Sequence, residues 1–173
     1  MSNIVITAAK RSPIGKFLGG LSSLSAPELG KLCIAAVMEH SKIPKDIVDE
    51  IIMGQVLTGG SGQNPARQSS ILAGIPEEKS ALTINQVCGS GLRAVSIGAQ
   101  SIISGQSEIV IAGGQESMSN AHHTSNLRNG LKMGDGELKD SMIIDGLWCA
   151  MNDYHMGTTA ENVAKKYKIS KED

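Results

Sequence analysis

The sequence predicts an α/β protein in which a mostly parallel sheet lies between layers of helices. The first observation is order, because residues 1–113 read as strand, helix, strand, helix, strand, helix, strand. The second is that the strand-like runs are continuously apolar rather than alternating, which is typical of strands buried on both faces. Strands that alternate with helices favour parallel pairing, since each helix returns the chain to the same end of the sheet.

Four apolar runs are expected to form the strands. They lie at residues 3–9, 50–57, 81–84 and 109–112. Ile and Val dominate most of these runs, and both residues favour a pleated, buried surface. We expect the run at 3–9 to be a central strand.

Capping signals mark where the first helix begins. Ser25 and Glu28 form a capping-box pattern with Pro27 in the first turn, which predicts a helix from about 27 to 40. A short helical turn should follow at 44–49. The expected apolar face of the first helix consists of Leu29, Leu32, Cys33, Ala36 and Val37.

Two further helices are expected before residue 106. Asn64 caps one that has Pro65 at its first position and that Gly74 stops. The other begins near residue 90 and ends before Gly105. Its helically spaced positions are Leu92, Val95, Ser96, Ala99, Ile102 and Ile103.

The character of the chain changes after the fourth strand. From 115 to about 157 the apolar periodicity fades and polar residues, glycine and methionine become common, so this part is functional or an inserted subdomain. A capping box at 158–161 predicts one more helix toward Lys168. We therefore expect two parts, residues 1–114 and 115–173.

Composition excludes several classes of function. The formal net charge is −1 and there is no basic stripe, which argues against nucleic acid as a partner. No apolar run is long enough to cross a bilayer, and no secretory signal is visible at the N-terminus. The three cysteines are far apart, which fits the reducing cytoplasm rather than a disulfide framework. Neither they nor the adjacent His122 and His123 have the spacing of metal ligands, so no metal is expected.

Cys88 lies where the third strand ends and the third helix begins, with Gly89 and Gly91 close behind it. The first turn of a helix carries unpaired N–H groups and a partial positive charge, which stabilise a thiolate. The glycines leave room for a substrate near the backbone, and the Cys88 N–H can point at an oxyanion formed on an attacked carbonyl. The pattern indicates a sulfur nucleophile, but a small buried cysteine fits the same position about equally well.

The Cys88 block, residues 85–95, closely resembles the acylated-cysteine motif of the thiolases. Three other blocks are similar to thiolase segments and occur in the order of that family: Gly-Gln-Asn-Pro-Ala-Arg-Gln at 62–68, Ala-Gly-Gly-Gln-Glu-Ser-Met-Ser at 112–119, and residues 152–162. The resemblance covers essentially the whole chain. It implies a thiolase-like fold, with 1–114 as the first βαβαβαββ half without its last strand and 115–173 as the beginning of an inserted loop domain.

The resemblance also implies a reaction. Thiolases of the acetyl-CoA C-acetyltransferase type condense two acetyl-CoA to acetoacetyl-CoA and CoA, or run the reverse thiolysis, and the matching residue for the acetyl group is Cys88. Leu147, His155 and Met156 are implied as coenzyme A contacts, with the thioesters as substrates and no further cofactor. From the residues alone, His155 reads as a loop histidine that bonds the backbone. The family resemblance further implies a homodimer or homotetramer.

Part of the machinery implied by the resemblance is absent from these residues. Thiolases use a histidine in a Gly-His-Pro block, a cysteine in a Cys-x-Gly-Gly-Gly block and an Asn-Glu-Ala-Phe block, none of which occurs in 1–173. We therefore expect an N-terminal fragment that does not turn over alone and has an open sheet edge beside the 109–112 strand. Two alternatives remain: a β-ketoacyl synthase-like enzyme that uses an acyl carrier protein, and a non-catalytic thiolase-like assembly module.

Overall fold

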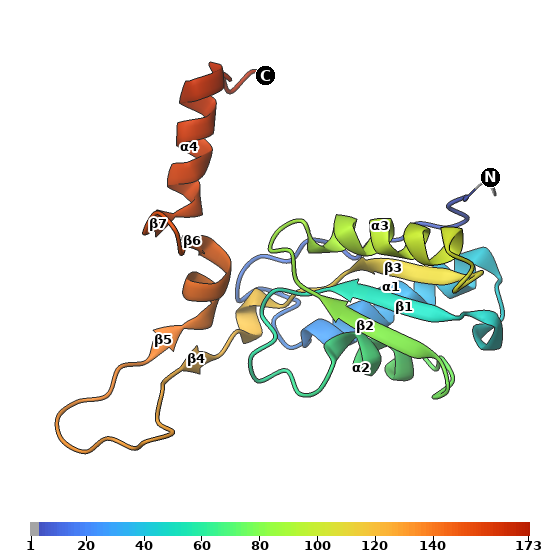
Figure 1. Ribbon diagram of the computed structural model, residues 1–173, viewed down its shortest axis with the longest axis horizontal. Coiled ribbons are helices and arrows are strands. Elements are labelled where there is room, and N and C mark those ends of the chain that lie inside the picture. Colours follow the sequence, from blue (N-terminus) through green and yellow to red (C-terminus); the bar gives the residue numbers. More distant parts are fainter. Residues whose placement is uncertain (1–3) are drawn as a thin grey trace. The chain divides into compact units, whose positions relative to one another are not determined.

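The structure is a computed structural model that describes residues 4–173, and it divides into two compact units. The first unit ends at Asn120, and the second comprises Ala121–Asp173. The sequence-based boundary lay at 114/115, where the last strand of the first unit ends. The first unit carries the sheet, and the second carries two short hairpins and a helix (Figure 1).

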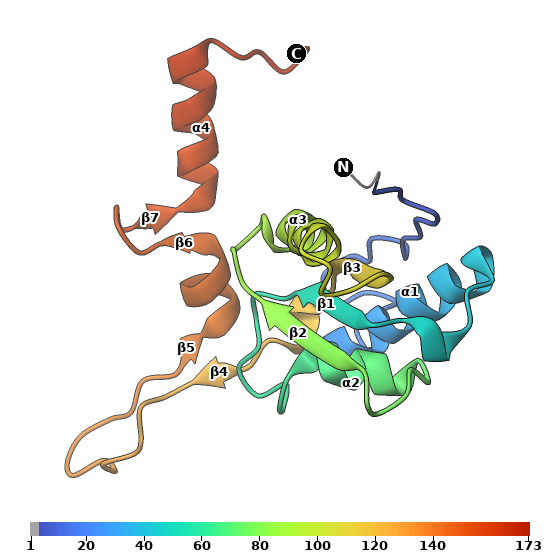
Figure 2. The ribbon, with the colours of Figure 1, turned by 45° about the vertical axis from the view of Figure 1, so that its right-hand side comes forward.

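The first unit has the three-layer α/β arrangement that the sequence predicts. Its sheet consists of three parallel strands in the order β2-β1-β3: β1 (Glu50–Gly54), β2 (Ser80–Ile84) and β3 (Val110–Gly114). Two helices cover one face and a third covers the other (Figures 1 and 2). These are α1 (Ala26–Ser41) and α2 (Pro65–Leu72) on the first face and α3 (Ser90–Ile103) on the second.

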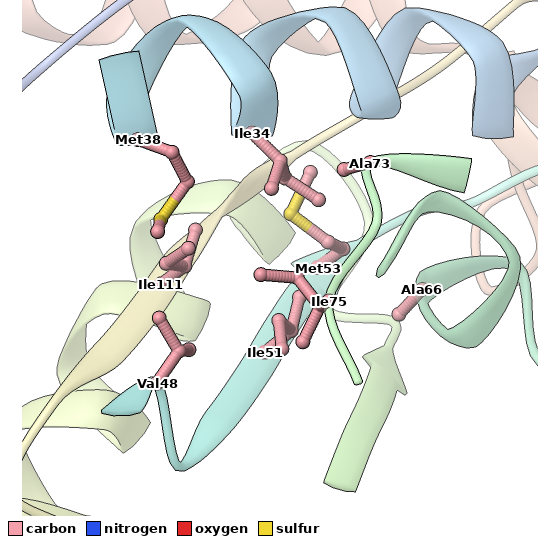
Figure 3. Packing of buried hydrophobic residues seen from close by; sticks show 9 residues of the cluster. All are labelled: Ile34, Met38, Val48, Ile51, Met53, Ala66, Ala73, Ile75 and Ile111. Carbon is pink, nitrogen blue, oxygen red and sulfur yellow. The ribbon is translucent and has the colours of Figure 1, made fainter. Parts of the chain in front are cut away.

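The main hydrophobic core lies between the sheet and the pair α1 and α2 (Figure 3). Ile51 and Met53 point from β1 into this core, whereas Ile52 points to the α3 side, and all three are almost fully buried. The strand β1 is therefore buried on both faces, as its continuous apolar run predicts. The other core members are Ile34, Met38, Val48, Ala66, Ala73, Ile75 and Ile111.

The outer strands are less buried than the sequence predicts. Leu82 in β2 is 41% exposed, and β3 is fully buried only at Ile111. Both strands are edges, because among the described residues each pairs with β1 alone. The expectation of burial on both faces was thus right for β1 and wrong for its neighbours.

The strand expected at 3–9 does not form in the structure. Residues 4–16 have no regular secondary structure, and Val5 and Ile6 are 71% and 79% exposed; Asn3 lies outside the described residues. A strand needs a neighbour to accept and donate its backbone hydrogen bonds, and among residues 4–173 this segment pairs with none. The apolar composition of the segment favours a strand, but it does not provide the partner strand.

Helix α1 begins where predicted but buries a different face. The capping box is present, with Ser25 and Glu28 bonded to each other's backbone N–H groups. Gly30 determines which face of α1 packs against the rest of the first unit, because an added Cβ there would collide with Gln115 and lie 2.7 Å from Ser69 Oγ. The buried positions are Ala26, Pro27, Gly30, Ile34 and Met38, whereas Leu32 of the expected face is 49% exposed.

Helix α3 also turns small residues toward the sheet rather than large ones. Its buried positions are Ser90, Ala94, Gly98 and Ser101. An added Cβ on Gly98 would lie 3.0 Å from Val110 Cγ1, so the helix backbone lies too near the sheet for a large side chain. Leu92 and Ile103, the first and last of its helically spaced positions, are 79% and 72% exposed.

Short elements make up the second unit. Two-residue strands form two antiparallel hairpins, β4 (His123–Thr124) with β5 (Lys139–Asp140) and β6 (Trp148–Cys149) with β7 (Tyr154–His155). A π-helical segment, η3 (Met142–Leu147), separates the hairpins, and α4 (Met156–Tyr167) follows them. The expected cap at Thr158 was wrong, because α4 begins earlier with His155 at its N-cap. Two 3₁₀ turns, η1 (Lys45–Ile47) and η2 (Met118–Asn120), complete the first unit.

Within residues 4–173, no helix combines the length and the apolar character that a membrane span requires.

Candidate active site

Cys88 stands at the carboxyl end of the parallel sheet. It follows β2, which ends at Ile84, and precedes α3, which begins at Ser90. The thiol-bearing residue is exposed, so it does not fit the reading of a small buried cysteine. The structure thus places a sulfur atom at the edge of the sheet where ligands of parallel α/β proteins bind.

The N-terminus of α3 is not covered by a side chain. Its N-cap, Gly89, makes no side-chain hydrogen bond, whereas Ser25 and Asn64 cap α1 and α2 through their side chains. The Cys88 N–H donates to no oxygen of the described residues. Since free N–H groups at a helix start attract negative charge, this turn can receive an anion or an oxyanion.

The turn that carries Cys88 is strained. Val87 has a φ of 48°, in the left-handed region that β-branched residues avoid. Such a conformation costs about 1–3 kcal/mol and persists only where the surroundings impose it. Here the Asn85 Oδ1 accepts the Val87 N–H at 2.8 Å, and the Ser90 Oγ contacts the backbone on both sides of Val87.

Two glycines at strand ends, Gly54 and Gly114, let the start of α3 rest directly on the sheet. A Cβ on Gly54 would lie 2.5 Å from the Ser90 carbonyl carbon and 2.7 Å from the Gly91 nitrogen. A Cβ on Gly114 would lie 3.2 Å from the Gly91 Cα. Gly54 ends β1 and is paired with Gly114 at the end of β3, so the helix start lies on the ends of two adjacent strands. Gly91, expected to leave room for a substrate, also packs against Gly114.

A buried polar network lies beside the ends of β1 and β3 on which α3 begins. The Gln115 Nε2 donates to Gln55 Oε1 at 2.9 Å, and the Ser69 hydroxyl donates to Gln115 Oε1 at 2.6 Å. Next to them, Glu116 accepts the N–H groups of Val56 and Leu57. Burial raises the pKa of Glu116, and these two backbone hydrogen bonds partly oppose the rise. The network ties the loop after β1 to the end of β3.

This network is not predicted by the sequence. The one signal for it is that Gln115 and Glu116 belong to the block at 112–119. Polar side chains that meet across a sheet come from distant segments, so no spacing pattern in the local sequence predicts their contact.

An open cavity of about 450 Å³ adjoins the turn. It lies between the loop after β1 and the end of β2, and Asn85 is the part of the Cys88 turn that lines it. Asn64 lines it too and is held in place, because its Oδ1 accepts from the Thr83 hydroxyl at 2.7 Å and its Nδ2 donates to the Ala81 carbonyl at 2.9 Å. The lining of the cavity also includes Gln55, Thr58, Gly62, Pro65, Leu82 and Ile84.

The other predicted site residues belong to the second unit. Leu147 ends η3, and Met156, which is 38% exposed, begins α4. His155 Nδ1 accepts the Gly157 N–H at 2.9 Å, which agrees with the reading of a histidine that bonds the backbone. Because Nδ1 accepts, the proton of a neutral ring sits on Nε2. A coenzyme A contact by these residues stays a prediction.

Cys149 is a second thiol with a distinctive environment. The Asn152 side chain donates to its Sγ at 3.3 Å. This bond, together with the backbone N–H groups of Asn152 and Met151, lowers the pKa of the Cys149 thiol. This environment is not predicted by the sequence, because no local pattern indicates the turn that brings the Asn152 side chain to the Cys149 sulfur.

Comparison with known proteins adds a family to this geometry. The family model described as "Thiolase, N-terminal domain" matches residues 4–173. An acetyl-CoA acetyltransferase of Cupriavidus necator is 55% identical over 173 residues, which cover 99% of this chain and 44% of that protein. One of Paracoccus denitrificans is 55% identical over 171 residues, with coverage of 99% and 44%. A probable acetyl-CoA acetyltransferase of Escherichia coli is 53% identical over 173 residues, again with 99% and 44%.

The chain therefore spans less than half the length of these curated relatives, and the family model that it matches is that of an N-terminal domain. The match runs through both units of the structure, from before α1 to after α4. On this evidence of sequence, confirmed by the parallel α/β sheet, the chain belongs to the thiolase family.

Proposed function

We propose that the protein is an acetyl-CoA C-acetyltransferase in which Cys88 accepts the acetyl group. The observation that carries the proposal is the exposed Cys88 thiol at the uncapped start of α3. The names of the relatives supply the substrate class, since those proteins are called acetyl-CoA acetyltransferases.

The first half-reaction follows from this geometry. The Cys88 thiolate attacks the carbonyl carbon of acetyl-CoA, and the carbonyl oxygen becomes an oxyanion that the Cys88 N–H stabilises. The carbon–sulfur bond to CoA then breaks, the oxyanion collapses to a carbonyl, and the CoA thiolate leaves and takes up a proton. The product is acetyl-Cys88, so the kinetics are ping-pong.

The second half-reaction forms the carbon–carbon bond. A base removes an α-proton from a second acetyl-CoA, and the resulting carbanion attacks the acetyl-Cys88 carbonyl and releases the Cys88 thiolate. The product is acetoacetyl-CoA, and the reverse direction is thiolysis. In the thiolases that the chain resembles, the base and the activating histidine come from blocks that residues 1–173 do not contain. Those residues alone are accordingly proposed to stop at the acetylated intermediate.

Several further features belong to the same proposal. Leu147, His155 and Met156 are proposed to contact the coenzyme A moiety, and the chemistry needs no cofactor besides the thioesters. We also propose a homodimer or homotetramer that works in the cytoplasm. The two open edges of the sheet support association, and three free cysteines in the described residues fit a reducing compartment.

Trapping the intermediate tests the proposal. The intact protein is incubated with acetyl-CoA alone, and peptide mass spectrometry locates the acetyl group. We expect one acetyl group on the Cys88 peptide, none after Cys88→Ala, and full labelling after Cys33→Ala or Cys149→Ala. An acetyl group on another cysteine, or on none, would overturn the assignment.

The same experiment separates the alternatives. A β-ketoacyl synthase-like enzyme would take its acyl group from a carrier-protein thioester and not from acetyl-CoA. A non-catalytic module would take it from neither donor.

A further inference from the structure

We propose that Ser90 is a positioning residue that aims the backbone N–H of Cys88. This inference rests on the proposed function, in which that N–H stabilises the oxyanion formed when acetyl-CoA is attacked. Ser90 touches neither thiol nor substrate in this account. It acts through the backbone of the turn.

The Ser90 hydroxyl bridges the strained residue. Its Oγ accepts the Gln86 N–H at 2.8 Å and donates to the Val87 carbonyl oxygen at 2.6 Å. One hydroxyl therefore fixes the backbone before and after Val87, whose φ of 48° is unfavourable by itself. Packing of the Val87 side chain adds little restraint, because that side chain is 47% exposed.

The bond to the Val87 carbonyl has a direct consequence for Cys88. The Val87 carbonyl and the Cys88 N–H belong to the same peptide group, which is planar and trans, so they point in opposite directions. When Ser90 draws the carbonyl toward the buried start of α3, the N–H must point away from it. This explains why the Cys88 N–H meets no acceptor in the described part of the chain.

Ser90 is itself held firmly. It is 4% exposed, and its backbone lies against Gly54, where even a methyl group would come within 2.5 Å. The hydroxyl consequently has little access to solvent, and its two backbone partners are its only hydrogen-bond partners within residues 4–173. The Ser90 backbone N–H also donates to the Val87 carbonyl, at 3.1 Å, so the hydroxyl is the shorter of two bonds that direct this peptide group and the one that also holds the Gln86 N–H.

Two reactions of the same thiol distinguish positioning from general stability. Attack on acetyl-CoA produces an oxyanion and needs the aimed N–H. Alkylation by iodoacetamide displaces iodide from a saturated carbon, so no oxyanion forms. For Ser90→Ala we expect the single-turnover rate of Cys88 acetylation to fall on the order of 10- to 100-fold, while alkylation of Cys88 changes less than about 3-fold.

Ser101→Ala is the matched control. Ser101 is another buried serine of α3, 6% exposed, whose hydroxyl bonds Glu50 and Ser107 at the opposite end of the helix. It should lower the midpoint of urea unfolding about as much as Ser90→Ala without changing the ratio of the two rates. Ser90→Thr keeps the hydroxyl and should restore most of the acetylation rate.

The outcomes decide the inference in each case. Equal losses of acetylation in Ser90→Ala and Ser101→Ala, or equal losses of acetylation and alkylation in Ser90→Ala, would overturn it. If Ser90→Ala does not fold, Asn85→Ala replaces it, because exposed Asn85 accepts the Val87 N–H from the other side of the turn. Asn85→Ala should lower the rate of acetylation more than the rate of alkylation. An equal effect on the two rates would again overturn the inference. A wild-type protein that acetyl-CoA does not acetylate would instead refute the proposed function.

Discussion

At the scale of single residues, the absence of side-chain atoms matters as much as their presence. Gly54, Gly91 and Gly114 come from three elements and meet where α3 begins. A Cβ on Gly54 would lie 2.5 Å from the Ser90 backbone and one on Gly114 3.2 Å from the Gly91 Cα, so these two glycines let backbone approach backbone. The position of Cys88 relative to the sheet thus depends on atoms that these residues lack.

Gly54→Ala tests this contact. The new methyl group would lie 2.5 Å from the Ser90 backbone, so the start of α3 must move. Overpacking of this kind costs about 1–3 kcal/mol, and we expect that loss in urea unfolding together with slower acetylation of Cys88. Gly59→Ala is the control, since nothing lies within 4 Å of its Cβ position. If the two variants are equally stable, the contact has no energetic weight.

Cys149 provides a second test at this scale. Hydrogen bonds from Asn152 lower the pKa of its thiol, so more thiolate is present near neutral pH than in an unperturbed cysteine. We expect Asn152→Ala to shift the pH midpoint of iodoacetamide labelling at Cys149 upward. Labelling of Cys33, measured by peptide mass spectrometry in the same samples, should keep its pH dependence. An unchanged midpoint at Cys149 would contradict the geometry.

At the scale of elements, carboxylates at the two ends of the central strand respond oppositely to pH. Asp49, just before β1, accepts the N–H groups of Glu108 and Ile109, and these bonds lower its pKa. Glu116 also accepts two N–H groups, beyond the other end of β1, but burial raises its pKa. Both carboxylates accept two backbone N–H groups, but their pKa values shift in opposite directions because only Glu116 is largely desolvated.

The pH dependence of unfolding should reveal both signs. The pKa of Asp49 is lowered on folding, so its contribution is present above the unfolded value of 3.8 and is lost as the pH falls through the folded value. The pKa of Glu116 is raised, so its contribution is present below 4.5 and is lost as the pH rises through the folded value. We expect Asp49→Asn to lose stability at pH 7 and Glu116→Gln to lack the decline above pH 4.5. Parallel pH profiles in urea for both variants and the wild type would contradict this.

The starts of α1 and α2 were predictable from the sequence, whereas the start of α4 and the packed faces were not. Ser25 and Asn64 succeed as signals because a cap is a contact with a residue three positions away. In α3 the close approach of helix and sheet excludes Leu92 from the packed face and selects Gly98, and that distance is set by other parts of the chain. The run at 3–9 failed for the same kind of reason, since a strand exists only with its neighbour.

The candidate site also has one part that the sequence predicts and another that it does not. Cys88 was predictable, because a cysteine between a strand and a helix is a local pattern. The roles of Ser90 and Gly54 were not, because they arise where the end of β1 meets the start of α3.

At the scale of the whole molecule, the two units differ in exposure. Residues 122–139 of the second unit are all exposed, and only the two-residue strands β4 and β5 pair within this stretch. In the first unit, by contrast, the basic side chains of Lys45 and Arg67 are anchored to backbone carbonyls, that of Lys45 to Ala73 at 2.7 Å. Exposed segments without hydrogen-bonded structure are where proteases cut first.

Brief trypsin treatment of the intact protein should therefore cleave early after Arg128 and Lys132, as well as in the irregular, exposed stretch of residues 4–16. Arg67, whose guanidinium donates to the carbonyls of Glu77 and Lys79, should resist much longer. Replacement of Arg128 and Lys132 by Gln should remove the early cuts within 122–139 and leave those within 4–16, as followed by mass spectrometry of the products. Early cleavage after Arg67 would contradict this order and would mean that α2 opens more readily than the exposed stretch.

The unpaired flanks of the sheet have a practical consequence for anyone who handles the protein. Among the described residues, β2 and β3 each leave one side of their backbone without a partner strand. If residues 1–173 are produced by themselves, solutions should turn turbid on concentration, because bare strands recruit one another. Dilute storage, or a short added peptide that lies along a bare flank, should keep such samples clear.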